Sequence, residues 1–458
     1  MSIDAAIRAL STVLGDRLSL SKSDLAAHGQ SETYFDPIAP DAVAYPRSTD
    51  EVSQIMAICS KHRCPVVGYG AGTSLEGHTL AIQGGIALDF CDMAQVLEVN
   101  NADMTVRVQP GITREALNED LRATGLFFPI DPGANASLGG MASTRASGTT
   151  AVRYGTMRDN VMALEVVLAD GRIIRTGSGA RKSSAGYDLT ALMVGSEGTL
   201  GLITELTLKL QGQPEATAAA TCAFETIDDA VQAVSATIAM GIPMARIEFL
   251  DAASVAAVNA YSKASIPVSP HLMVEFHGSD QGVAEQAERF GEIAAEFGGS
   301  AFEWATKPED RTRLWQMRHH AYWAILASRT GATAIVTDVC VPISKLAQAV
   351  AETQADIESS TILAPILGHV GDGNFHAILL IDPNSTDEKR EAQELSARMA
   401  ERAIDLGGTI TGEHGVGMGK LPYMVDEHGA GWDVMAQIKR ALDPQNILNP
   451  GKVVRVNG

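Results

Sequence analysis

The pattern of apolar and polar residues predicts a helix early in the chain that leads into a glycine-rich segment. Ser48 and Glu51 have the spacing of a capping box, and apolar residues then recur on one helical face. Pro65 ends this helix, and 65–67 has the pattern of a short buried strand. Further elements follow in the first half: strands 105–109, 164–169, 172–176 and 204–210, a helix 112–124, and a two-residue turn at Asp170-Gly171.

Strand-like and helix-like segments alternate in the second half, after a break in character at 211–214. The alternation predicts a two-layer α+β unit over about 215–405, in which helices cover a sheet. The expected strands are 219–224, 245–250, 272–276 and 333–341, and the expected helices are 227–240, 282–297, 311–327 and 343–357. A short helix, 432–442, is expected near the C-terminus.

Three glycine-rich clusters lie in the first half, at 68–85, 133–155 and 195–201. A Rossmann or Walker-A loop requires a helix directly after it, and no helical period follows the first cluster, so both interpretations are poor. A nest of backbone N–H groups can bind phosphate without a helix, whereas a loop that only turns the chain is an equal alternative for this cluster alone. Three such clusters in one domain favour close backbone approach to a long phosphate-bearing ligand.

Two histidines flank a turn signal in the second half. If Asp372-Gly373 formed a two-residue hairpin turn, His369 would pair directly with His376, with Cβ atoms about 5 Å apart. That spacing suits two imidazoles that hold one divalent ion. The alternative is an ordinary hairpin in which one histidine satisfies a buried polar group. Because two opposed imidazoles on an apolar ladder are costly without a common partner, the metal is favoured.

Glu413 and His414 are adjacent and lie among glycines in the segment 409–417. Alone, this segment could be a charged surface loop. Beside two metal-type histidines, Glu413 would supply a carboxylate ligand, and His414 would be left as a group that titrates near neutral pH. Zinc, manganese or another first-row ion would fit such a set. Arg318 falls on a predicted helix and, by itself, has the pattern of a solvated surface residue.

Charge and composition narrow the class of protein. The 458 residues include 35 basic and 55 acidic side chains, a net charge of −20, which argues against nucleic-acid binding and against a basic face on anionic lipid. The five cysteines have no metal or redox spacing. Since neither a membrane span nor the apolar core of a signal peptide is seen, we expect a cytoplasmic protein, free or peripheral at the inner face of the membrane. The oligomeric state stays open, a homodimer included.

The order of the glycine clusters resembles the FAD-binding domain of vanillyl-alcohol oxidase type flavoproteins. The C-terminal motifs narrow the resemblance to the FAD-dependent D-lactate dehydrogenase (cytochrome) family, from about Phe35 to Val454. It implies an α+β fold with an FAD-binding domain over 1–213, an α/β (ferredoxin-like) substrate or cap domain over 214–408, and a C-terminal segment, 409–458, that returns to the flavin. Although His78 is the obvious candidate for a covalent flavin link, the resemblance implies non-covalent FAD.

The resemblance also implies roles for single residues. His369, His376 and Glu413 would bind the metal, Arg318 would bind the substrate carboxylate, and His414 would be the general base; His369 and His414 would also contact the substrate. The implied FAD contacts are Tyr69, Gly70, Ala71, Gly72, Thr73, Ser74, Gly77, Pro132, Gly133, Leu138, Gly139, Gly140, Ser143, Gly148, Tyr154, Gly155, Glu197, Gly198, Gly201, Ile203 and Asn449.

The implied reaction is oxidation of a short D-2-hydroxy acid, D-lactate to pyruvate before others, with FAD as hydride acceptor. Electrons would pass to cytochrome c or a quinone-linked carrier. Ile378 and Val336 stand where the related 2-hydroxyglutarate enzymes carry Asn and Lys, which favours a monocarboxylate. The alternatives are a D-2-hydroxyglutarate or glycolate dehydrogenase or oxidase, and a non-catalytic flavoprotein subunit; the intact His and Glu set argues against the last.

Overall fold

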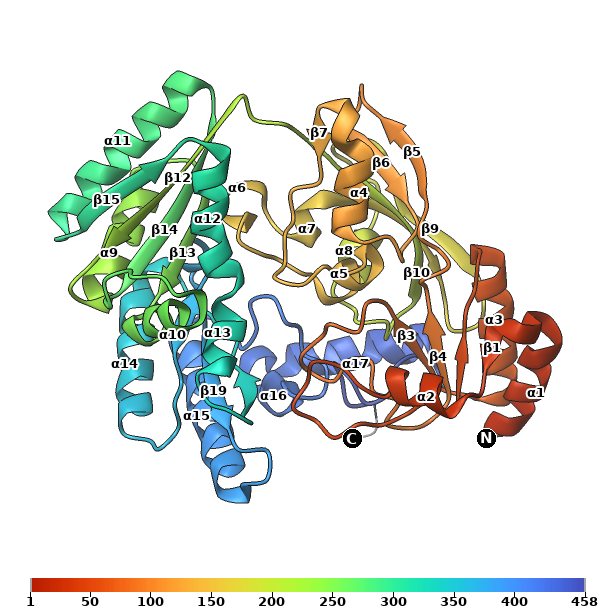
Figure 1. Ribbon diagram of the computed structural model, residues 1–458. Helices are drawn as coiled ribbons and strands as arrows, with labels where there is room; N and C mark the ends of the chain where they lie inside the picture. Colours follow the sequence, from red (N-terminus) through yellow and green to blue (C-terminus); the bar gives the residue numbers. More distant parts are fainter. Residues whose placement is uncertain (1, 457–458) are drawn as a thin grey trace. The chain divides into compact units, whose positions relative to one another are not determined.

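A computed structural model describes residues 2–456 of the chain. The chain divides into two compact units (Figure 1). Unit 1 comprises 1–147, 155–213 and 413–458, and unit 2 comprises 148–154 and 214–412. In the described part of the chain, no helix combines the length and the apolar character needed to cross a membrane.

Unit 1 contains a four-stranded sheet in which three adjacent strands run parallel and the fourth, at one edge, is antiparallel to its neighbour. The strand order is β1 (Leu18–Ser19), β2 (Ala42–Ala44), β4 (Ile86–Asp89), β3 (Val66–Tyr69). Helix α3 (Thr49–His62) begins as predicted, because the Ser48 hydroxyl accepts the N–H of Glu51 at 3.3 Å. The Glu51 carboxylate binds Arg17 and the N–H of Arg47, so only half of the expected capping box forms. Helices α1 (Ile3–Leu14) and α3 pack with these strands into one apolar core.

A second, antiparallel sheet of unit 1 has the order β5 (Val96–Asn100), β6 (Thr105–Val108), β10 (Leu202–Lys209), β8 (Val161–Val167), β9 (Ile173–Gly177). The hairpin predicted at Asp170-Gly171 joins β8 to β9, but its loop has three residues instead of two. The N–H of Leu168 donates to the carbonyl of Arg172 at 2.9 Å, and Gly171 adopts φ +88°. The left-handed conformation at Gly171 makes the extra residue possible.

Short elements and the C-terminal segment complete unit 1. The helices are α2 (Lys22–His28), α4 (Arg114–Leu121), α5 (Leu138–Thr144), α7 (Met157–Asn160), α8 (Leu189–Met193), α16 (Met424–His428) and α17 (Ala430–Leu442), and a small sheet pairs β7 (Leu126–Phe127) with β11 (Gln211–Gly212). The C-terminal segment extends the first sheet, since the N–H of Val66 donates to Ile447 and the N–H of Asn449 donates to the carbonyl of Val66.

Unit 2 is built on one large sheet. Its order is β15 (Ser300–Ala305), β12 (Ala216–Ala223), β14 (His271–Gly278), β13 (Met244–Leu250), β18 (Ile366–Gly368), β19 (Asn374–Ile381), β16 (Thr333–Val336), and β17 (Val339–Cys340) pairs with β19. All of these pairings are antiparallel. The predicted strand 333–341 is therefore interrupted at Thr337-Asp338, which separates β16 from β17.

The sheet consists of two ferredoxin-like halves joined at β13 and β18. In the first half, α9 (Ile227–Ala239) follows β12 and α11 (Asp280–Glu296) follows β14. In the second half, α14 (Leu346–Glu358) follows β17 and α15 (Thr386–Asp405) follows β19; an isolated bridge of Cys340 with Thr409 stands where the fourth strand would be. This arrangement confirms the expected α+β fold with a ferredoxin-like domain.

Helices cover both faces of this sheet. Figure 1 shows α11 and α12 (Pro308–His319) on opposite sides of the strands β12 to β14. The predicted helix 311–327 is in fact two helices, α12 and α13 (Ala321–Ala327), which meet at His320. On the face of α12 and α13, together with α10 (Ala252–Ser262), the strands carry apolar residues at one end and polar residues at the other. The polar residues of this face are Arg246, Glu248, Glu275, His277 and His376.

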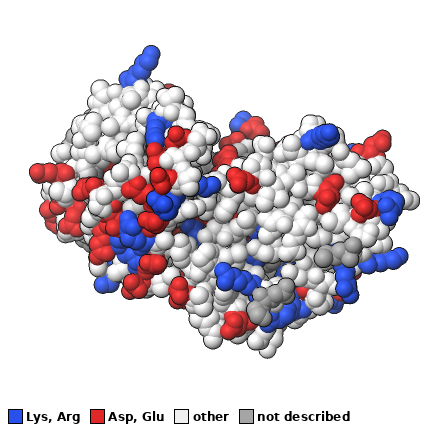
Figure 2. All heavy atoms as spheres, turned by 90° about the horizontal axis from the view of Figure 1, so that it is seen from below, with Lys and Arg blue, Asp and Glu red and all other residues white. Residues whose placement is uncertain are grey.

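Surface charges in unit 2 are arranged in mixed clusters. In the face drawn in Figure 2, basic side chains stand among acidic ones in the left part of the view.

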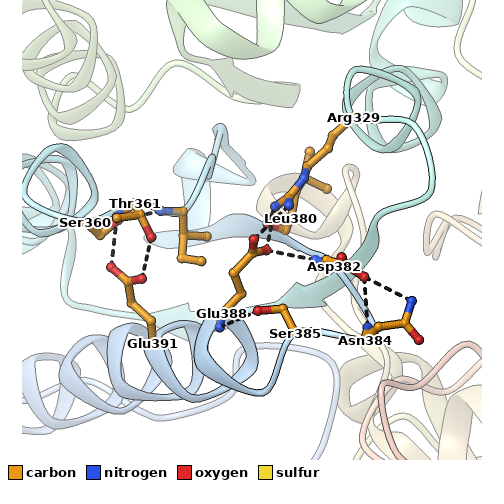
Figure 3. Close-up of polar contacts among 10 residues, drawn as sticks. Arg329, Ser360, Thr361, Leu380, Asp382, Asn384, Ser385, Glu388 and Glu391 are labelled. Atoms are coloured by element: carbon orange, nitrogen blue, oxygen red, sulfur yellow. Dashed lines mark hydrogen bonds and ion pairs between the residues drawn. The ribbon is translucent and has the colours of Figure 1, made fainter.

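A surface network joins the N-terminus of α15 to the end of β19 (Figure 3). Arg329 donates to both carboxylate oxygens of Glu388, at 2.7 and 2.9 Å, and to the carbonyl of Leu380. The hydrogen bonds from Arg329 and from the N–H of Asp382 lower the pKa of Glu388 to about 2.

We predict that Glu388→Gln lowers the melting temperature at pH 7 by a small amount, since the carboxylate is ionised there and paired. The folded-state pKa of Glu388 lies below its ordinary value of 4.5. The contribution is therefore present above pH 4.5 and is lost as the pH falls toward 2. Thermal unfolding of both proteins across this range should show the difference shrink. Glu394→Gln on the same helix is the control, and a difference that persists at low pH would contradict the prediction.

Candidate functional site

The first glycine cluster forms an extended loop in unit 1 that is suited to an anion. It follows β3 directly and contains no helix, as expected. Among the described residues, no partner is found for the backbone N–H groups of 71–74, and the buried hydroxyl of Ser74 is also unpartnered. Gly72 has φ +72°, and a Cβ there would lie 2.3 Å from the Tyr69 hydroxyl. Unpaired donors with a buried hydroxyl fit the phosphate groups of a dinucleotide.

The second cluster differs from the loop that the sequence indicated. Helix α5 (Leu138–Thr144) forms within it and starts at Leu138. Gly139 allows this helix to pack on Pro110, because a Cβ would lie 2.5 Å from the Pro110 side chain. The Ser143 hydroxyl donates to the carbonyl of Gly139 at 2.8 Å. Gly139 therefore serves close packing, whereas Gly133 has open space around it.

The third cluster places a buried carboxylate against the loop that follows His414. Glu197 accepts the N–H groups of Val416 and Gly417 at 2.6 and 2.8 Å, and His78 Nε2 lies 3.2 Å from its second oxygen. Burial acts to raise the pKa of Glu197, but the neighbouring His78 and the hydrogen bonds outweigh it and lower the pKa. A Cβ on Gly415 would lie within 2.8 Å of both side chains. The Glu197 side chain thus anchors this loop.

Asn449 and Lys452 bind the backbone of the first and third glycine clusters. The Asn449 amide donates to the carbonyls of His78 and Glu197 at 3.1 and 2.8 Å. The Lys452 ammonium donates to the carbonyl of Leu80 and to the Asn449 side chain, both at 2.8 Å. Burial lowers the pKa of Lys452 to about 8. The C-terminal segment therefore holds together the loops proposed to contact FAD.

His376 lies at the polar end of the sheet in unit 2, next to the break between β16 and β17. Its Nδ1 is 2.9 Å from the carbonyl of Thr337. Because a carbonyl only accepts, Nδ1 carries the proton and Nε2 carries the lone pair of the neutral ring. Asp338, fully buried, accepts from the Asn374 amide at 2.8 Å and from the Thr411 hydroxyl at 2.6 Å. The break in the strand thus orients the imidazole.

His369 lies close to His376, but the turn that connects them differs from the predicted one. In the ladder, His376 pairs with Leu367, and residues 370–372 form a short 3₁₀ turn; the expected two-residue turn with His369 opposite His376 was wrong. Gly373 has φ +81°. Even so, the two imidazole rings are 5.6 Å apart, and a ring nitrogen of each lies within 4.8 Å of the other. The structure therefore brings the two predicted ligands together.

Glu248, on β13, was not anticipated. Its carboxylate is fully buried and accepts from His369 Nδ1 and from Arg318 Nε, each at 2.7 Å. Burial acts to raise the pKa of Glu248, yet the neighbouring Arg318 and His369 and their hydrogen bonds outweigh it and lower the pKa. Arg318 is therefore not a solvated surface residue. A single acidic residue in a strand has no sequence motif, so only the cross-strand arrangement reveals Glu248.

The segment 409–412 carries the chain toward Glu413 and His414. It pairs with β17 through Thr409, and Thr411 binds Asp338 as described above. A Cβ on Gly412 would lie 2.4 Å from the Asn374 amide, so the backbone passes directly over it. Glu413 is the next residue, with its Cα about 3.8 Å from that of Gly412. The roles of Glu413 and His414 stay predictions.

Tyr154, expected to contact FAD, belongs to unit 2. Its hydroxyl is 2.7 Å from His277 Nδ1, and His277 Nε2 is 2.8 Å from Glu275. Gly148 lies in the same short segment, whereas Gly155 belongs to unit 1. Gly155 has φ +77°, and a Cβ there would lie 2.7 Å from the Asp159 side chain.

Comparisons with known proteins match both parts of the chain. Residues 40–177 match the family model "FAD binding domain", and residues 213–453 match "FAD linked oxidases, C-terminal domain". The chain is 47% identical to a probable mitochondrial D-lactate dehydrogenase of Danio rerio, over 99% of this chain and 93% of the relative. It is 45% identical to the mitochondrial D-lactate dehydrogenase [cytochrome] of Arabidopsis thaliana, over 98% of this chain and 80% of the relative.

The chain belongs to the FAD-dependent D-lactate dehydrogenase (cytochrome) family. It is also 40% identical to a glycolate oxidase subunit of Bacillus subtilis, over 90% of this chain and 89% of the relative. Its fold is similar to p-cresol methylhydroxylase, with a TM-score of 0.81 at 17% identity, over 99% of this chain and 97% of that one. These results confirm the vanillyl-alcohol oxidase type fold and an FAD-dependent oxidoreductase.

We predict that Glu197→Gln destabilises unit 1 by about 1–3 kcal/mol, because an amide cannot accept hydrogen bonds with both of its terminal atoms. One of the N–H groups of Val416 and Gly417 would lose its acceptor, and His78 would lose a charged partner. Chemical unfolding of the FAD-loaded protein would measure the change. Glu98→Gln, at an exposed carboxylate, is the control. Unchanged stability would show that Glu197 does not anchor the loop.

Proposed function

We propose that this protein oxidises a short D-2-hydroxy acid, D-lactate before others, to the 2-keto acid, with FAD as the hydride acceptor. The observation that carries the proposal is the pair His369 and His376 beside the Glu248–Arg318 pair on one polar end of the unit 2 sheet. This end offers imidazole nitrogens and a guanidinium, which suit a hydroxyl and a carboxylate on adjacent carbons. Relatives named D-lactate dehydrogenase support the same substrate.

We propose further that a divalent ion, zinc or manganese, is held by His369, His376 and Glu413. The chemistry of the donor set supports this, since each histidine has its Nδ1 engaged by a protein acceptor and its Nε2 directed away from it. Glu413 follows Gly412, whose backbone passes over Asn374. When bound, FAD supplies the hydride acceptor and the ion supplies Lewis-acid polarisation of the substrate hydroxyl.

The chain's own residues would bind and orient the substrate. Arg318 would pair with the carboxylate, because its hydrogen bond to Glu248 uses Nε and leaves the two Nη groups for a forked contact. His414 would take the hydroxyl proton as general base. The loops with Tyr69–Ser74, Leu138–Ser143 and Glu197–Ile203, together with Asn449, would hold FAD without a covalent link.

A monocarboxylate is favoured by a pair of apolar residues. Val336 and Ile378 are direct partners in the ladder of β16 and β19, and both belong to the apolar cluster under α10 and α13. A second carboxylate would find no charged partner at these positions. Glycolate is the second candidate substrate, because a glycolate oxidase subunit is 40% identical to this chain.

The electron acceptor, the location and the oligomeric state stay proposals. Cytochrome c or a quinone-linked carrier is the proposed acceptor, in line with the relative named D-lactate dehydrogenase [cytochrome]. The sequence predicts a cytoplasmic protein, and the mitochondrial names of several relatives give a second location to test.

Anaerobic mixing with D-lactate, L-lactate, glycolate and D-2-hydroxyglutarate tests the substrate. We expect D-lactate to bleach the flavin absorbance fastest and L-lactate to leave it unchanged. Release of peroxide in air would indicate an oxidase instead of a dehydrogenase. Flavin that none of these acids reduces would support a non-catalytic subunit and overturn the proposal.

We predict that His414→Ala slows flavin reduction by D-lactate about 10²- to 10⁴-fold, as expected for loss of a general base. The dissociation constant for D-lactate should change far less, since Arg318 remains. Stopped-flow reduction at several substrate concentrations separates the two quantities. His428→Ala, at a partly exposed histidine of α16, is the control, and an unchanged limiting rate in His414→Ala would reject the base.

We predict that His376→Ala loses the divalent ion but retains FAD. Metal analysis and the flavin absorbance of one purified sample measure both. Wild-type protein prepared with zinc or manganese should hold about one ion per chain. Equal metal content in the variant and the wild type would exclude His376 as a ligand.

A further inference from the structure

Glu248 joins the two groups that the proposed function needs most. It lies in the middle of β13, on the sheet face that also carries His376, and its side chain has no solvent exposure. One oxygen accepts from Arg318 on α12 and the other from His369 after β18, each at 2.7 Å. Two elements far apart in the sequence thus meet on one carboxylate.

The geometry of a carboxylate makes this contact a constraint on both partners. Its two oxygens are rigidly related, so the guanidinium and the imidazole that bind them are held in a fixed relative orientation. An ionised carboxylate only accepts hydrogen bonds, so His369 donates from Nδ1, and as a neutral ring it then presents its lone pair at Nε2. Arg318 must donate from Nε, and for its two Nη groups no other partner is found among the described residues.

We propose that Glu248 is a positioning residue that couples the substrate-binding arginine to the metal-binding histidine. This inference rests on the proposed function. Glu248 itself touches neither substrate nor ion: it fixes the tautomer of His369 and the direction of the Arg318 fork. A displacement of Glu248 therefore weakens metal binding and carboxylate binding together. If Arg318 and His369 were each held by a different residue, one change would affect only one of the two.

A buried ion pair that serves stability alone is the competing explanation. Glu275 offers a matched control, because it is also a buried carboxylate on the same sheet face. It lies on β14, 2.8 Å from His277 and 3.6 Å from Arg246, and neither of these is a proposed ligand. Replacing Glu275 by glutamine also removes a buried negative charge, but it leaves the hydrogen bonds of His369 and Arg318 intact.

The test compares Glu248→Gln with Glu275→Gln as FAD-loaded proteins. A glutamine at 248 has one accepting oxygen, and if Arg318 takes it, the amide N–H faces His369 and forces its proton onto Nε2. We expect Glu248→Gln to lower the affinity for Zn²⁺, measured by competition with a fluorescent chelator, by about 10- to 100-fold. KM for D-lactate should rise as well, while Glu275→Gln keeps the Zn²⁺ affinity of the wild type.

Glu248→Asp gives a second test that keeps the charge in place. Its carboxylate is withdrawn by one methylene, so Zn²⁺ affinity should fall and KM should rise again, with FAD content unchanged. Wild-type Zn²⁺ affinity and KM in either folded variant would overturn the inference. The proposed function is judged on the wild type alone: a wild type that binds no divalent ion, or is not reduced by D-lactate, would contradict that function.

Discussion

A neutral imidazole has a single lone pair to offer, and the group that binds its N–H decides which nitrogen presents it. In unit 2, a backbone carbonyl makes this decision for His376 and a carboxylate makes it for His369. Both rings are thereby set to present Nε2. The substrate, metal and base chemistry proposed here depends on these two hydrogen bonds, because rings in the other tautomer would present an N–H where a lone pair is needed.

The hydrogen bonds in turn depend on features of the sheet. The carbonyl of Thr337 is available because the strand is interrupted between β16 and β17, which frees this carbonyl from the regular ladder. Glu248 reaches His369 because side chains alternate along β13, which puts it on the same face as His376. Unit 1 uses a similar device, since buried Glu197 collects the N–H groups of the loop that follows His414. In each unit, a buried carboxylate with matched donors fixes the residues around it.

The sequence predicted elements well where local signals were strong. The cap at Ser48, the strand before the first glycine cluster and the alternation of strands and helices after 215 were all confirmed. The predictions from the sequence failed where contacts between distant segments determine the local structure. Glycine is a poor helix former, yet α5 contains Gly139 and Gly140, and the missing side chain of Gly139 lets the helix pack closely on Pro110. Glu248 could not be found, since nothing nearby in the sequence marks a strand carboxylate that bridges residues 70 and 121 positions away.

At the histidine hairpin, the predicted turn and register were wrong, but the predicted proximity of the two imidazole rings was right. A two-residue turn would have placed His369 opposite His376, but Gly371 packs against Ile247 and Val152, where a Cβ would lie within 2.8 Å of both side chains. This packing favours the 3₁₀ turn over the tighter hairpin and shifts the register. The rings still meet, because His376 is held by Thr337 and His369 by Glu248, neither of which belongs to the hairpin. The ring positions are therefore fixed by Thr337 and Glu248, which lie outside the turn.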